Sequence, residues 1–352
     1  MIKFRALVCS VIVGIVLTLS GSLPAWAATA NKAISLTTSP VSTDLAGKPG
    51  SSVSTTLQVM NNSSLPLNIT VQLDTFKASG TTGQAQIVTP KTGDDFIKWV
   101  TFSKNSFIAQ PGVWNSVQMT INLPSYAALG YYYAVLFKPT IPNPAIKGTA
   151  SLKGSNAILV LLNAESANEK AKIQVTSFTT SKKIYEYLPV DFSVNVNNNG
   201  NIYLPPKGDI YISHSTNFSK PIDVLSINPS QGNVLPGSSR VYKSQWVNGF
   251  PVFVPKTLAG QPVTNKDGTP ISQLKWDFSQ NNKFRFGKYY AKMVLVYSNG
   301  TNDVPITATV SFWVIPWKLI ILFILFIAMI VGLVILVIYL THKLKKKTQW
   351  KA

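Results

Sequence analysis

Apolar and polar residues alternate with a period of two along much of the chain. The alternation is clearest in residues 52–60, 67–73, 116–123, 190–196 and 306–312. Successive side chains of a strand point to opposite faces, so this period predicts antiparallel sheets with one buried face. Asn, Ser, Pro and Gly cluster between these segments, as is typical of turns between short strands. We therefore predict that residues 28–315 are all-β.

A weak internal repeat divides this region into two domains. Residues 109–117 (AQPGVWNSV) precede 130–137 (GYYYAVLF), and residues 234–241 (VLPGSSRV) precede 287–296 (GKYYAKMVLV). Pro-Gly favours a tight turn that starts a strand. The repeat and the short strands predict two tandem immunoglobulin-like β-sandwiches without a disulfide, over residues 28–166 and 167–315. The second copy is longer between its turn and its Gly-Tyr strand, which predicts an insertion over residues 248–283.

The opposite pattern, an unbroken apolar run, occupies residues 319–340, where no side chain is charged. A helix of that length crosses a hydrocarbon core of about 30 Å. Trp317 and Tyr339 lie at its ends, where aromatic rings prefer the headgroup layer. We predict a transmembrane helix over residues 316–341. The lysine-rich tail, 342–352, is then cytoplasmic by the positive-inside rule, and the chain before the helix is extracellular.

The N-terminal end has the order of a secretory signal peptide. Lys3 and Arg5 precede an apolar run over residues 6–19, and small residues end at Ala27. Residues 1–27 are therefore predicted to be a removed signal peptide. Cys9 is the only cysteine, so the mature chain contains none, which favours a bacterial cell-surface protein over a eukaryotic one.

Charge adds little to this description. The predicted extracellular part carries 24 of the 32 Lys and Arg residues and all 13 acidic residues. A basic surface attracts anionic wall polymer, lipid headgroups or nucleic acid. The lysines are scattered singly, however, and no nucleic-acid motif is present, so solubilising charge is the simpler interpretation.

The architecture and several short motifs resemble the WxL-interacting proteins of Gram-positive cell surfaces. The matching segments are residues 53–71, the turn 110–112 (QPG), the run from 123 to 131, and Phe312-Trp313 before the membrane. The resemblance implies two immunoglobulin-like domains, the first associated with peptidoglycan and the second with a partner protein. The insertion and the Pro-Gly turn of the second domain depart from that family's partner-binding domain.

Catalytic chemistry is not indicated. His214 is the only histidine before the helix, and no G-x-S-x-G sequence supplies a nucleophile. No spacing of His, Cys and acidic residues suits a metal ion, and no glycine-rich phosphate loop is present. We therefore expect a non-enzyme with no cofactor and no metal site.

Aromatic residues are the remaining candidates for binding. Trp276 and Phe278 lie in the predicted insertion, while Trp114 and Tyr132 lie in repeated strands where a core role competes. The favoured function is a membrane-anchored surface protein that binds cell-wall glycan, a surface protein partner, or both. The alternative is an accessory or scaffold subunit of a membrane or secretion assembly. An exposed sheet edge that serves as a chaperone for secreted proteins is a third possibility.

Overall fold

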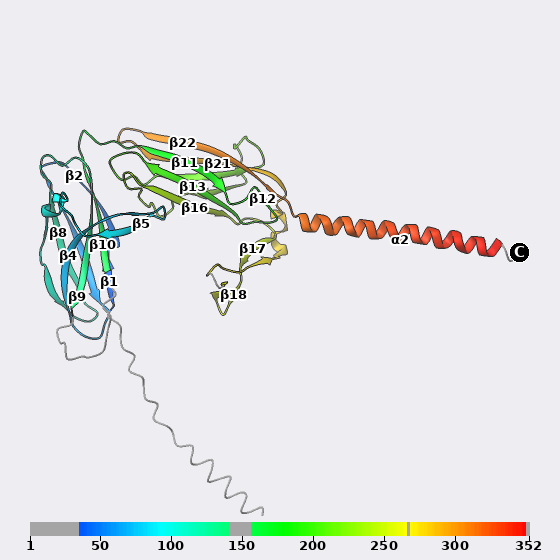
Figure 1. Cartoon of the computed structure of the whole chain (residues 1–352), viewed down its shortest axis with the longest axis horizontal. Helices are drawn as coiled ribbons and strands as arrows, with labels where there is room; N and C mark the ends of the chain where they lie inside the picture. The colour runs from blue at the N-terminus through cyan, green and yellow to red at the C-terminus, as the bar shows by residue number, and fades with distance from the viewer. Residues whose placement is uncertain (1–34, 141–155, 266–267, 350–352) are drawn as a thin grey trace, which may run out of the picture.

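The computed structural model describes residues 35–140, 156–265 and 268–349 (Figure 1). Two β-rich parts are followed by one long helix, which confirms the all-β prediction and the single C-terminal apolar helix. The predicted signal peptide, residues 1–27, lies outside the described residues.

The first β-sandwich, residues 36–164, consists of two sheets. One sheet has the order β1 (Leu36–Ser39), β3 (Ser52–Asn61), β8 (Trp114–Asn122) and β6 (Val100–Phe102). The other has the order β2 (Ser42–Gly47), β10 (Asn156–Ala164), β9 (Gly130–Thr140), β4 (Leu67–Ser79) and β5 (Gln84–Val88), and β7 (Ser106–Ala109) also pairs with β4. A 3-10 helix, η1 (Asp95–Trp99), precedes β6. Leu57, Met119, Tyr133 and Ile158 from both sheets fill the core between them.

The second β-sandwich, residues 173–314, is built in the same way. Its smaller sheet has the order β11 (Ile173–Thr180), β13 (Val190–Asn198) and β16 (Ser239–Trp246). Its larger sheet has the order β12 (Ile184–Tyr185), β22 (Asp303–Val314), β21 (Gly287–Ser298), β14 (Lys207–Ser213) and β15 (Asp223–Ser226). Phe192, Trp246, Tyr289 and Phe312 are large, fully buried side chains at its centre.

Residues 248–283 form small elements at one end of the second sandwich. β17 (Val252–Pro255) pairs with β20 (Ser272–Lys275), and β18 (Thr257–Leu258) pairs with β19 (Gln261–Pro262). The 3-10 helix η2 (Phe278–Lys283) follows. Together they carry the aromatic residues predicted in the insertion.

Helix α2 (Trp317–Gln349) starts three residues after β22 ends and projects away from both sandwiches (Figure 1). Its segment Trp317–Thr341 is long and apolar enough to cross a bilayer, and none of it is buried against the rest of the chain. Such a surface has no packing partner within the described residues, as a lipid-facing helix would require. Residues 350–352 of the predicted tail lie outside the described part of the chain.

The two sandwiches pack against each other through the outer face of β9 and β10. Tyr133, Val135 and Phe137 point into the first core, while the alternate residues of β9 point outward. These outward residues are covered by Tyr203 and Leu235 of the second sandwich. Strands buried on both faces have continuous apolar sequences, which explains why β9 and β10 lack the alternation of the other strands.

Candidate functional site

One end of the first sandwich is organised by a buried asparagine. The Asn61 Nδ2 donates hydrogen bonds to the backbone carbonyls of Leu65, at 2.8 Å, and Ala109, at 2.9 Å. The backbone carbonyl of Asn61 accepts a hydrogen bond from Gly112 N at 2.8 Å. One side chain therefore joins the turn 61–66 to the turn 109–114, and both turns have a fixed shape.

The second sandwich repeats this arrangement around Asn198. Its Nδ2 donates to the carbonyls of Ile202, at 2.7 Å, and Val234, at 2.8 Å. Its own carbonyl accepts from Gly237 N at 2.9 Å. The asparagine, the carbonyl four residues later and the Pro-Gly turn therefore match between the two domains.

Each sandwich thus has two turns joined by one buried asparagine, which we call the turn pair. The two copies of the turn pair have different surroundings. In the second sandwich, Tyr203 and Leu235 directly follow the carbonyls that Asn198 binds, and both pack on the first sandwich. Around that contact, Val241 N donates to the Thr81 carbonyl at 2.8 Å. The chain thus uses one copy of the turn pair to dock one sandwich onto another.

The copy in the first sandwich is exposed. We call Leu65, Val113 and Trp114 the distal turn surface. Their exposed fractions lie between 44% for Trp114 and 54% for Leu65. Neither turn, 61–66 or 109–114, contains a charged residue. Exposed apolar side chains on a rigid, uncharged backbone are typical of the centre of a protein-binding surface.

Trp114 is the predicted binding residue that lies on this surface, at the start of β8. Tyr132 does not share it. Its ring lies 5.7 Å from that of Phe76 and 6.3 Å from that of Tyr203, between the two sandwiches. Burial raises the pKa of the Tyr132 phenol well above its usual value.

Trp276 and Phe278 lie together in the insertion, apart from the other two predicted residues. Their rings stack at 6.1 Å with an interplanar angle of 24°. Phe250 contacts both rings edge-on or tilted, at 5.7 and 5.4 Å, and Tyr187 contacts Trp276 at 6.2 Å. The aromatic residues of the insertion therefore pack on the second sandwich, with their outer edges exposed.

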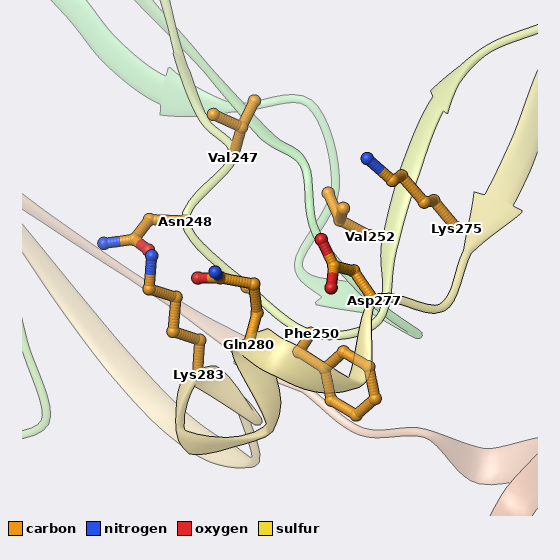
Figure 2. A pocket seen from close by; sticks show the side chains of 9 residues that line it. Val247, Asn248, Phe250, Val252, Lys275, Asp277, Gln280 and Lys283 are labelled. Carbon is orange, nitrogen blue, oxygen red and sulfur yellow. The ribbon is translucent and has the colours of Figure 1, made fainter.

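A cavity of about 330 Å³ lies beside this cluster (Figure 2). It is lined by Val247, Asn248, Gly249, Phe250, Val252, Lys275, Asp277, Gln280 and Lys283. The Asp277 carboxylate accepts hydrogen bonds from Ser279 N and Oγ, at 3.2 and 2.6 Å, and these bonds lower its pKa. Asp277 is the one carboxylate of this lining and caps η2, so the cavity does not hold a pair of carboxylates.

His214 is placed away from this cavity. Its Nδ1 lies 3.3 Å from the Lys288 carbonyl, and its ring packs at 4.2 Å on that of Tyr289. Within the described ranges, no group of three His, Cys, Asp or Glu residues could hold a metal ion.

Leu65 and Val113 were not predicted from the sequence as parts of a binding surface. The internal repeat could have drawn attention to the two turns that carry them. The Asn-rich turn 61–66 (NNSSLP) and the Pro-Gly turn both have counterparts in the second domain. The sequence shows the repetition but not that one copy is covered and the other exposed.

A scan against protein-family models and a comparison with curated proteins find no match. Solved structures with some similarity include several pilus chaperones and a PapD-like domain of human CEP192. The class 5 fimbrial chaperone CfaA is 20% identical, with a TM-score of 0.35 over 69% of this chain and 100% of its own. The Salmonella enterica SafB chaperone, in complex with the SafA pilin, gives 11% identity and a TM-score of 0.36 over 80% and 99%. Scores this low do not assign a family, so the resemblance to WxL-interacting proteins stays a prediction and the function must follow from the chain's own surfaces.

Proposed function

We propose that this chain is a membrane-anchored, non-catalytic surface protein that binds a protein partner through the distal turn surface. Helix α2 is the anchor in this proposal. The lysine-rich tail supports a cytoplasmic C-terminus, because basic residues favour that side of the membrane. Both sandwiches then lie outside the cell.

The repeated turn pair carries this proposal. The copy around Asn198 already docks on an apolar sheet face, and the copy around Asn61 is organised by the same hydrogen bonds. The first copy leaves Leu65 and Trp114 exposed, whereas the second copy packs on a neighbouring sandwich through Tyr203 and Leu235. Burial of such apolar area is the main driving force for association. A partner with an apolar, largely uncharged sheet face fits this surface best.

Cell-wall glycan, the other predicted partner, gains no support from the described residues. Tyr132 is packed between the two sandwiches and offers no free ring face for a sugar. Trp114 shares its surface with aliphatic side chains, whereas sugar hydroxyls need nearby hydrogen-bonding groups.

Co-purification of the full chain from its own membrane tests the proposal. We would compare the wild type, the double variant Leu65→Ser/Trp114→Thr, and the control Val41→Ser/Val224→Thr, which removes exposed apolar side chains elsewhere. We expect at least one protein to be lost more than tenfold from the first variant and retained in the control. Identical sets of co-purifying proteins in all three samples, at equal thermal stability, would contradict the proposal.

A further inference from the structure

Four aromatic side chains are exposed at the end of the second sandwich where α2 begins. We call Trp276, Phe278, Phe284 and Phe286 the juxtamembrane aromatic surface. Their exposed fractions range from 45% for Trp276 to 70% for Phe278. Soluble surfaces rarely expose four neighbouring aromatic rings, so this end requires a specific contact.

The strand register places this surface level with the start of the helix. Gly287, directly after Phe286, pairs with Val314, and Lys288 pairs with Trp313. Trp317 begins α2 three residues after Val314, a distance of roughly 10 Å along an extended chain. Figure 1 shows the insertion and the start of α2 at the same end of the second sandwich. If α2 enters a bilayer, this surface lies at the bilayer's edge.

Packing holds these rings in place. Phe250 contacts both Trp276 and Phe278, which stack on each other. Near Phe284 and Phe286, the Arg285 Nε donates to the Asn248 carbonyl at 2.9 Å. The aromatic surface is therefore preorganised and needs little ordering when it binds.

The helix is also fastened to this end of the sandwich. Lys318 Nζ forms an ion pair with Glu186 Oε2 at 2.9 Å. Glu186 lies between Tyr185, which pairs with Val314, and Tyr187, which contacts Trp276. The start of α2 and the aromatic surface therefore share one set of supporting residues.

Charge indicates what the surface contacts. Residues 268–288 contain four basic side chains and one acidic side chain, Asp277. The basic residues are Lys275, Lys283, Arg285 and Lys288. Aromatic rings favour the headgroup layer of a bilayer, and basic side chains beside them are attracted to anionic headgroups. A surface that binds a protein partner has no reason to lie level with the start of α2, whereas a surface that binds lipid headgroups must lie there.

We propose that the juxtamembrane aromatic surface lies in the headgroup layer and binds anionic phospholipid. The bilayer is then a second support for the second sandwich, in addition to α2, and it sets the tilt of the whole extracellular part. This inference rests on the proposed membrane anchoring and adds the insertion as a lipid-binding site.

Fluorescence quenching in nanodiscs tests the inference on the full chain. The background is Cys9→Ser, and a single fluorophore is attached at Asn282→Cys, an exposed position of η2. Lipids carrying a nitroxide on the headgroup are the quencher, in discs of phosphatidylcholine with or without phosphatidylglycerol. We expect at least twofold quenching in the anionic discs, much less in neutral discs, and loss of quenching in Phe278→Ser/Phe286→Ser.

Two further label positions separate the possible failures. Thr301→Cys lies on the turn between β21 and β22, at the opposite end, and should not be quenched. Ile330→Cys lies within α2 and should be protected from a water-soluble quencher in every disc. Protection at 330 without quenching at 282 would overturn this inference and leave the anchor intact. Exposure at 330 would overturn the proposed anchoring itself. Equal quenching at 282 in neutral discs would overturn the assignment to anionic lipid.

Discussion

Asn61 shows how one residue fixes the shape of a binding surface. Its side chain is fully buried and donates to two carbonyls, while its Oδ1 accepts from Ser63 N at 2.9 Å. Buried backbone groups that lose such a partner cost free energy, because water no longer reaches them. The rigid presentation of Leu65 therefore depends on an amide that donates and accepts at once.

Replacement of Asn61 by aspartate should destabilise the fold at least as much as replacement by alanine, because a buried carboxylate would also face two carbonyl oxygens. A carboxylate cannot donate to the Leu65 and Ala109 carbonyls, so both variants leave these groups unpaired. We expect a loss of about 1–3 kcal/mol in the free energy of unfolding. Chemical denaturation measures it, with Asn62→Ala at an exposed neighbouring position as the control. A stable Asn61→Asp protein would show that the two turns do not need this amide.

Tyr132 leads to a different expectation. Its hydroxyl is buried and has no hydrogen-bond partner in the described part of the chain. Tyr132→Phe should therefore leave the free energy of unfolding at neutral pH unchanged or raise it, because an unsatisfied polar group is removed. Tyr242→Phe is the matched control, since it loses a 2.9 Å hydrogen bond to the Gly232 carbonyl and should cost about 1 kcal/mol.

The same tyrosines predict a loss of stability at alkaline pH. Burial raises the pKa of Tyr242 to about 12, from an ordinary value of 10, and also raises that of Tyr132. Above pH 10 the unfolded chain ionises first, so the free energy of unfolding falls as the pH rises toward 12. Tyr132→Phe should reduce this fall, which unfolding measurements between pH 8 and pH 11 would show, and an unchanged fall would contradict the expectation.

The aromatic candidates also show what the sequence can predict at this scale. Successive side chains of a strand point to opposite faces, so once β9 is recognised as a strand Tyr132 lies on the face opposite Tyr133, which fills the core. This rule cannot predict that the second sandwich covers that face, because the contact joins residues about seventy positions apart through Tyr203. Trp114 has the same pattern and stays exposed, so periodicity alone does not distinguish the two.

At the scale of elements, the β4–β5 hairpin explains how the two sandwiches hold their relative position. Its turn reaches the edge strand β16, where Val241 N binds the Thr81 carbonyl (Figure 1). Arg240 lies against this turn, and its Nη1 donates to the Asn233 carbonyl at 2.9 Å. The long β4 could be predicted from its alternation, but the docking of its hairpin could not, since turn residues carry no periodic signal.

Gly83 and Gly80 give a matched test of this contact. Both have positive φ, at 77° and 56°, so valine strains the hairpin at either position. A Cβ at Gly83 would clash with the Arg240 guanidinium and displace it from its contact with this turn, whereas a Cβ at Gly80 meets nothing within 4 Å. We expect Gly83→Val, and not Gly80→Val, to broaden the distance distribution between spin labels on the two sandwiches. Equal distributions in both variants would show that the hairpin does not fix the angle.

At the scale of the whole molecule, the second sandwich lies between the first sandwich and helix α2. Helix α2 and the insertion lie at one end of the second sandwich, and the first sandwich lies at its other end (Figure 1). The strands and the apolar helix could be predicted because periodicity and length are local properties. The angle between the sandwiches could not, because it depends on the small cluster of Phe76, Tyr132, Tyr203 and Leu235.

This arrangement places the two proposed binding surfaces on different sandwiches. The juxtamembrane aromatic surface lies at the end of the second sandwich where α2 begins, and the distal turn surface lies on the first sandwich. An apolar contact joins the two sandwiches. The distal turn surface is the one that we propose to contact a protein partner.

Site-specific crosslinking tests this contact. A photoreactive group is attached at Ser64→Cys, an exposed position beside Leu65, in the Cys9→Ser full chain within its own membrane, and at the control position Val224→Cys on β15. We predict one discrete adduct of higher mass from position 64, absent from position 224 and lost when Trp114→Thr is added. No adduct from position 64, or the same adducts from both positions, would contradict the proposed protein partner.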